Sequence, residues 1–149
     1  MDLVSPRLVS DFLISESRER GDILTNLTLQ KLLYYAQAWF LALYNKALFD
    51  EDFQAWVHGP VLPSQYNRFR EFQWRPITAN IHKPLSLSAM IARHLNEIVS
   101  IFGVETASSL ESMTHSEKPW IEARRGLSPT APSTNVISKE TMKKFYRSL

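Results

Sequence analysis

The four histidines of this 149-residue chain, His58, His82, His94 and His115, are the side chains best suited to acid–base or metal chemistry. No two lie four residues apart, and neither a His-Glu-x-x-His motif nor clustered carboxylates occur, so a metal site would need ligands from distant segments. A Ser/His/Asp triad could be assembled from separate segments, but the Gly-x-Ser-x-Gly motif is absent. We therefore predict no catalytic, metal-binding or cofactor-binding residues, and we expect that the protein is not an enzyme.

The positions of the glycines and the absence of cysteine exclude further kinds of functional site. Gly21, Gly59, Gly103 and Gly126 are too scattered to form a phosphate-binding loop. Without cysteine there are no disulfides, thiolate metal sites or cysteine nucleophiles, which is compatible with a reducing cytosol. The N-terminal residues do not resemble a signal peptide, and the longest apolar stretch, 32–44, is too short to span a membrane. We expect a cytoplasmic protein without membrane contact.

Two short motifs place histidine beside tryptophan and proline. The first is Trp56-Val57-His58-Gly59-Pro60, and the second is His115-Ser116-Glu117-Lys118-Pro119-Trp120. In an alternating strand, Trp56 and His58 share one face, and tryptophan is frequent at protein-binding hot spots. A structural role is the alternative for both motifs: a neighbouring helix would cover the strand face, or Trp120 would anchor a helix junction while His115 caps the preceding carbonyls.

The charge of the chain is uneven along its length. Seventeen Lys and Arg against fifteen Asp and Glu give a net charge of +2, and the pI of about 9.0 overstates how basic the protein is. Residues 1–114 carry −2 and residues 115–149 carry +4. The basic segment 139–147 could contact an acidic partner or nucleic acid, although positive residues near a helix C-terminus also favour the helix dipole. The small net charge argues against a dedicated DNA-binding domain.

Hydrophobic periodicity predicts a mainly α-helical fold. In residues 28–45 the apolar side chains cover most of the helix circumference, which is typical of a helix in the middle of a small fold. Ser5-Pro6 begins the first helix, and Ser138 caps the last. The helices are expected at residues 6–20, 28–45 (capped by Thr28), 63–72, 86–102 or 88–102, 105–114, 116–125 and 138–148.

The β structure is expected to be small. Residues 53–58 alternate between the two faces of a strand, which Gly59-Pro60 should end because proline cannot donate to a sheet. Ile77 and Ile81 are expected in a weak edge strand, and residues 126–134 in a surface loop. The prediction is a mainly α, compact single domain over residues 1–149, with about six to seven helices around a central apolar helix and a small β element.

Three segments, in one order and spacing, resemble the motifs of a known family. Residues 29–39 read Leu-Gln-Lys-Leu-Leu-Tyr-Tyr-Ala-Gln-Ala-Trp. Residues 53–61, an alternating segment ending in Gly-Pro-Val, are followed by Pro63 and Tyr66, and Thr114-His115 precedes Pro119-Trp120. In these features the chain resembles the Panacea domain family, also called SocA/GepA-like, over a motif-bearing core of about residues 7–125.

The resemblance implies an antitoxin of a bacterial or phage toxin–antitoxin system that neutralises a cognate protein toxin by direct binding. It implies no catalytic residues, and without an extra domain it implies no DNA binding. The alternative is a nucleic-acid-binding regulator, or an adaptor that delivers a toxin to a protease, acting through the basic helix 138–148. The identity of the toxin and the oligomeric state stay open. The candidate partner-binding residues are Trp56, His58, Pro60, Tyr66, His115 and Trp120.

Overall fold

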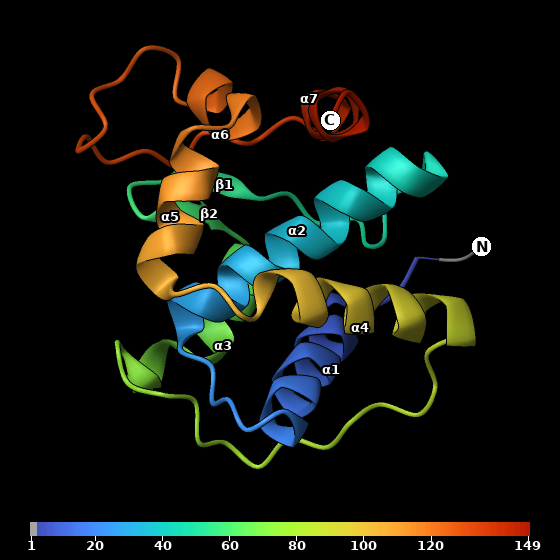
Figure 1. Ribbon diagram of the computed structural model, residues 1–149. Coiled ribbons are helices and arrows are strands. Elements are labelled where there is room, and N and C mark those ends of the chain that lie inside the picture. The colour runs from blue at the N-terminus through green and yellow to red at the C-terminus, as the bar shows by residue number, and fades with distance from the viewer. Residues whose placement is uncertain (1–2) are drawn as a thin grey trace.

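The computed structural model describes residues 3–149 and, within that range, shows a helical fold with one small sheet (Figure 1). A 3-10 helix, η1 (Arg70–Phe72), follows α3, and β1 (Gln54–Trp56) pairs with β2 (Gly59–Val61) in an antiparallel hairpin. The prediction of a mainly α, compact single domain with a small β element is confirmed. The α-helices are α1 (Pro6–Glu19), α2 (Asn26–Tyr44), α3 (Pro63–Arg68), α4 (Ala89–Phe102), α5 (Ala107–His115), α6 (Lys118–Ala123) and α7 (Lys139–Arg147).

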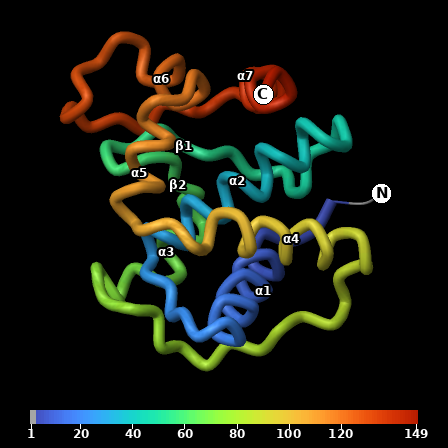
Figure 2. The backbone as a smooth tube through the Cα atoms, in the orientation of Figure 1, coloured from blue at the N-terminus to red at the C-terminus, as the bar shows by residue number. Residues whose placement is uncertain are grey.

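Helix α2 forms the centre of the fold, as its apolar circumference predicts. It contacts α1, α3, α4, α5, α7 and β2. Figure 2 shows α7, the last helix, beside the C-terminal half of α2, with α4 on another side. Leu29, Leu32 and Leu33 are fully buried, and Tyr34 and Tyr35 are 1% exposed. A helix covered on several sides cannot carry a continuous polar stripe, which explains its largely apolar sequence.

Capping residues set most helix starts. Ser5, Ser88 and Ser138 each accept a hydrogen bond from a backbone N–H of the first turn of α1, α4 and α7. Ser5 and Ser138 are the predicted caps, and Ser88 is one of the two alternatives, Ser86 or Ser88, expected for α4. The predicted start of α2 is wrong, because Thr25 caps the helix and accepts from the N–H of Thr28. Thr28 therefore lies inside the first turn, and α2 is three residues longer at its N-terminus than expected.

The β1–β2 hairpin corrects the predicted end of the β element. Gly59-Pro60 does not end the β element but enters the second strand, where Pro60 pairs with Ala55. Proline is tolerated there because β2 lies at the edge of the sheet in the described structure. On the other side of β1, residues 135–137 add backbone hydrogen bonds, from the N–H of Ala55 to the Asn135 carbonyl and from the N–H of Ile137 to the Phe53 carbonyl.

The segment between η1 and α4 is extended but forms no strand. Ile77 is fully buried, and its N–H donates to the carbonyl of Leu24 at 2.8 Å, while Ile81 is half-buried. The expected edge strand at Ile77 and Ile81 is therefore wrong, since a single bridge, Thr25 with Pro76, replaces a ladder. The predicted helix over 63–72 is divided into α3 and η1.

Candidate functional site

The β1–β2 hairpin carries His58 at its tip and lies against α2 and α5. Gly59 has a φ of 120°, a conformation that residues with side chains rarely adopt. A Cβ at this position would lie 3.1 Å from both Lys31 Cε and Thr114 Oγ1. Glycine at residue 59 therefore allows the backbone of the hairpin to approach the two helices this closely.

His58 pairs with Glu111 of α5 at the hairpin tip. The Nδ1 atom of His58 lies 2.8 Å from Oε1 of Glu111, and the side chains are 64% and 34% exposed. An ion pair this exposed contributes at most about 1 kcal/mol to stability. Both side chains are therefore accessible for contacts with a partner at little structural cost.

Trp120 connects α6 to the hairpin. Its Nε1 donates to the carbonyl of Trp56 at 2.8 Å, and the ring of His115 stacks on the indole with centroids 4.0 Å apart and planes 15° apart. Trp120 is 4% exposed, so the indole serves mainly as an internal anchor. The structural alternative for this motif was that His115 caps the carbonyls of α5. In the structure the ring of His115 packs against the Trp120 indole instead.

Arg124 joins the same junction, although the sequence analysis did not single it out. The side chain is buried, and its guanidinium donates to the carbonyls of Ala55, Ser128 and Ala131. The guanidinium carbon also lies 4.7 Å from the centroid of the Trp120 ring. This residue ties the loop after α6 to strand β1, which fixes the backbone beside the candidate site.

Trp56 and Tyr66 form an aromatic pair on the other side of the hairpin. Their rings meet edge to face with centroids 4.9 Å apart, and both residues are half-buried. Pro60 is buried in β2, so it shapes the hairpin but presents little surface. An open depression of about 470 Å³ is lined by Trp56, Val57, His58, Pro132, Ser133 and Thr134. The candidate residues thus gather around one hairpin, and Trp56 and His58 are the two that line the depression.

Lys31 of α2 lies beneath this hairpin and was not among the predicted site residues. It is 2% exposed, and its amine makes no hydrogen bond or ion pair with any other residue of the range 3–149. Burial lowers the pKa of Lys31 to about 8, against the attraction of Glu111. The sequence carried one indication that Lys31 is unusual: it is the single charged residue of α2, a helix that is otherwise apolar nearly all round.

A second buried polar cluster surrounds Glu117, between His115 and Trp120 in the sequence. The hydroxyls of Tyr35 and Tyr146 donate to Oε1 of Glu117 at 2.7 and 2.8 Å, and the Tyr146 hydroxyl lies 3.0 Å from that of Tyr34. Burial raises the pKa of Glu117, and these hydrogen bonds oppose the shift. The cluster links α2, α6 and α7, so it supports the helix junction from inside.

Helix α7 was the alternative site. Met142 and Tyr146 are buried against α2, and several of its charges already have partners on the protein. Lys139 pairs with Asp52, while Lys143 and Lys144 lie 3.3 and 3.8 Å from Glu140. Local pairing thus reduces the positive charge that this helix offers to an acidic surface.

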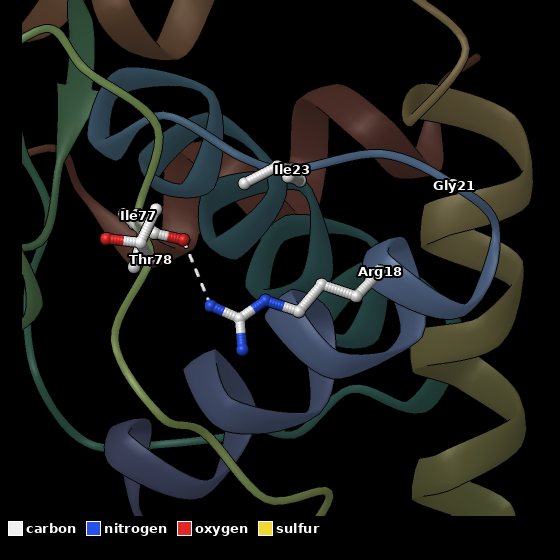
Figure 3. Close-up of a pocket in the computed structure, with 5 residues that line it drawn as sticks. All are labelled: Arg18, Gly21, Ile23, Ile77 and Thr78. Carbon is white, nitrogen blue, oxygen red and sulfur yellow. Dashed lines mark hydrogen bonds between the residues drawn. The ribbon is translucent and has the colours of Figure 1, made fainter.

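A depression distant in sequence from the hairpin is shown in Figure 3. It has a volume of about 440 Å³ and is lined by Arg18, Gly21, Ile23, Ile77 and Thr78. Arg18 donates to the carbonyl of Ile77 at 3.0 Å and also to that of Ala79. Because the guanidinium is engaged in holding the extended segment, we assign this depression a structural role.

No group of three His, Asp or Glu side chains in residues 3–149 is arranged to hold a metal ion. The helices of the same range include none with both the length and the hydropathy needed to cross a bilayer.

Comparison with known proteins defines the class of protein to which these features belong. Residues 29–121, which include α2, the hairpin, α5 and the Trp120 anchor, match the family described as Antitoxin SocA-like, Panacea domain. This match covers more than half of the chain, so the protein belongs to the SocA-like Panacea domain family. The chain is also similar to Antitoxin SocA of Caulobacter vibrioides (strain NA1000 / CB15N), with 29% identity over 145 residues, 89% of this chain and 74% of that protein. No solved structure matches it significantly.

Family membership confirms the resemblance that the three motifs predicted and supports an antitoxin role. It also points to a regulatory rather than a catalytic role and, in general terms, to a toxin as partner.

Proposed function

We propose that this protein neutralises a cognate protein toxin by binding it directly, without catalysis, through the surface around the β1–β2 hairpin. The observation that carries this proposal is the position of Trp56 and His58 beside an open depression of about 470 Å³, on a hairpin fixed from below by Trp120 and Arg124. A rigid surface with an accessible tryptophan is favourable for binding, because little conformational freedom is lost on association.

Co-expression with the product of the adjacent reading frame tests the proposal. Growth arrest by that product alone, its relief on co-expression and a purified complex would support direct neutralisation. Failure of co-expression to relieve the arrest would contradict it. Repeating the experiment in a host that lacks ATP-dependent proteases separates occlusion from delivery to a protease, since only occlusion survives the deletion. Cell fractionation tests the predicted cytoplasmic location.

Trp56→Ala tests the contact surface. We expect at least a tenfold loss of toxin affinity, in line with the cost of truncating a hot-spot tryptophan, and a melting temperature close to that of the unmodified protein. Trp74→Ala is the matched control, because Trp74 is 79% exposed and lies outside the hairpin surface. A large fall in melting temperature for Trp56→Ala, or equal losses of affinity for both variants, would place the contact elsewhere.

The alternative of nucleic-acid binding through α7 has a simple test. A regulator would bind its own promoter DNA at low salt and lose affinity steeply as salt rises. The pairing of all three lysines of α7 with carboxylates of this chain argues for the protein-binding role.

A further inference from the structure

A buried positive cluster lies directly beneath the hairpin, and the structure leaves it electrostatically incomplete. Lys31 and Arg124 are each 2% exposed, and His115 has a buried Nε2 without a hydrogen-bond partner in the described residues. The backbone of Val57 lies beside the His115 ring but does not complete a hydrogen bond of normal geometry to Nε2.

The carboxylate nearest to this cluster is already engaged elsewhere. Glu111 attracts both Lys31 and His115, yet its Oε1 is bound to His58 at 2.8 Å, and no ion pair joins it to Lys31 among residues 3–149. Burying an ammonium group without a partner costs several kcal/mol, so buried charges are normally paired. Arg124 is already bound to three backbone carbonyls, whereas the amine of Lys31 has no carboxylate paired with it within residues 3–149.

This amine lies directly beneath the proposed binding surface. The amine of Lys31 lies under Gly59, and a Cβ added at that residue would be 3.8 Å from Nζ. Because glycine has no side chain, only backbone covers the amine on that side. Thr114 Oγ1 lies near the same glycine and is a further polar group facing this space. His58 and Glu111, which pair with each other beside the hairpin tip, are exposed enough to reorient when a partner approaches.

We propose that a carboxylate side chain of the bound toxin completes this cluster by pairing with Lys31 at the base of the hairpin. The inference rests on the proposed function and deepens it, because it specifies an acidic residue at the centre of the toxin's contact surface. Pairing a buried, preformed cation gives specificity as well as affinity, since a toxin without the acid leaves the amine unpaired in the complex.

Lys31→Met is the diagnostic variant, because methionine has a similar length and no charge. In the free protein we expect a melting temperature that is unchanged or higher, since an unpaired buried charge is removed. In the complex we expect a loss of toxin affinity of at least about tenfold, the range measured for close interfacial charge pairs. Lys31→Gln repeats the test with a polar neutral residue, and Lys46→Met is the matched control because Lys46 is exposed beyond the end of α2.

A double-mutant cycle identifies the partner group. Each exposed Asp and Glu of the toxin is changed to Asn or Gln and measured against both the unmodified antitoxin and Lys31→Met. One acidic residue should weaken binding to the unmodified protein and have little further effect on Lys31→Met. If affinity is unchanged in Lys31→Met while the unmodified protein still binds, the inference fails and the proposed function stands. If the unmodified protein does not bind the toxin, both fail.

Two other outcomes would also overturn the inference. Loss of affinity with a fall in melting temperature, and without coupling to any toxin carboxylate, would give Lys31 a purely structural role. The second outcome concerns sodium acetate at constant ionic strength. If acetate stabilises the free protein but not Lys31→Met, and does not compete with the toxin, the cluster binds a small carboxylate instead.

Discussion

Replacing Glu117 separates the hydrogen-bonding role of this residue from its charge. In Glu117→Ala the hydroxyls of Tyr35 and Tyr146 lose the acceptor that they meet at 2.7 and 2.8 Å. Hydrogen bonds to a charged group contribute about 1.5–3 kcal/mol each, and partial solvent access to the site favours the lower value. We expect a loss of about 3 kcal/mol of unfolding free energy, equivalent to a melting temperature lower by about 6–12 °C.

Glu117→Gln should behave differently, because the amide oxygen can accept from the same two hydroxyls. Burial raises the pKa of Glu117 in the folded protein, so the carboxyl favours folding when protonated, and this contribution is lost as pH rises through the folded pKa. The glutamine variant has no such loss. Its stability relative to the unmodified protein should therefore increase from about pH 4 toward neutral pH.

Urea denaturation of the three proteins at several pH values measures these differences, and subtraction from the unmodified protein removes the contribution of other titrating groups. Equal stability of Glu117→Ala and Glu117→Gln would show that the tyrosine hydroxyls do not depend on this acceptor. A relative stability of Glu117→Gln that falls with rising pH would refute the assigned direction of the pKa shift.

Two further changes test the backbone contacts of the hairpin. Trp120→Phe removes the hydrogen bond to the Trp56 carbonyl and part of the buried indole, and we expect a loss of about 2 kcal/mol in urea denaturation, with a value below 0.5 kcal/mol contradicting the anchor role. Gly59→Ala should cost more, about 2–3 kcal/mol, because of its φ of 120° and a Cβ 3.1 Å from Lys31 Cε. Gly21→Ala, with a φ of 85° and open space around the Cβ, is the control and should be the milder change.

The features predicted correctly from the sequence are those that depend on local interactions. A serine cap acts within one helical turn, so Ser5, Ser88 and Ser138 could be recognised without knowledge of the fold. The start of α2 was predicted at Thr28, whereas the cap is Thr25, a residue of the same type three positions earlier. In the first turn that this cap adds, the side chain of Asn26 donates to the Tyr66 carbonyl, a contact that links α2 to α3.

The features missed from the sequence depend on contacts between distant segments. Pro60 was expected to end a strand, but the free outer edge of β2 admits it, and strand order at an edge cannot be read from local propensity. Lys31 and Glu117 are charged residues that would normally be expected at the surface. Lys31 is buried and Glu117 half-buried because of how the other elements pack around α2, so the sequence could mark Lys31 as unusual but could not show what surrounds it.

The position of α7 against α2 has a consequence for biosynthesis. Residues 139–147 cover one side of α2, and Tyr146 completes the hydrogen-bonded cluster with Tyr34 and Glu117. A nascent chain shorter than this exposes the aromatic side of α2 to solvent, chaperones and proteases. Contacts this distant in sequence form late, so the hairpin surface gains its full support only after residue 146 has been translated. Active protein then forms only from chains whose translation has been completed through α7.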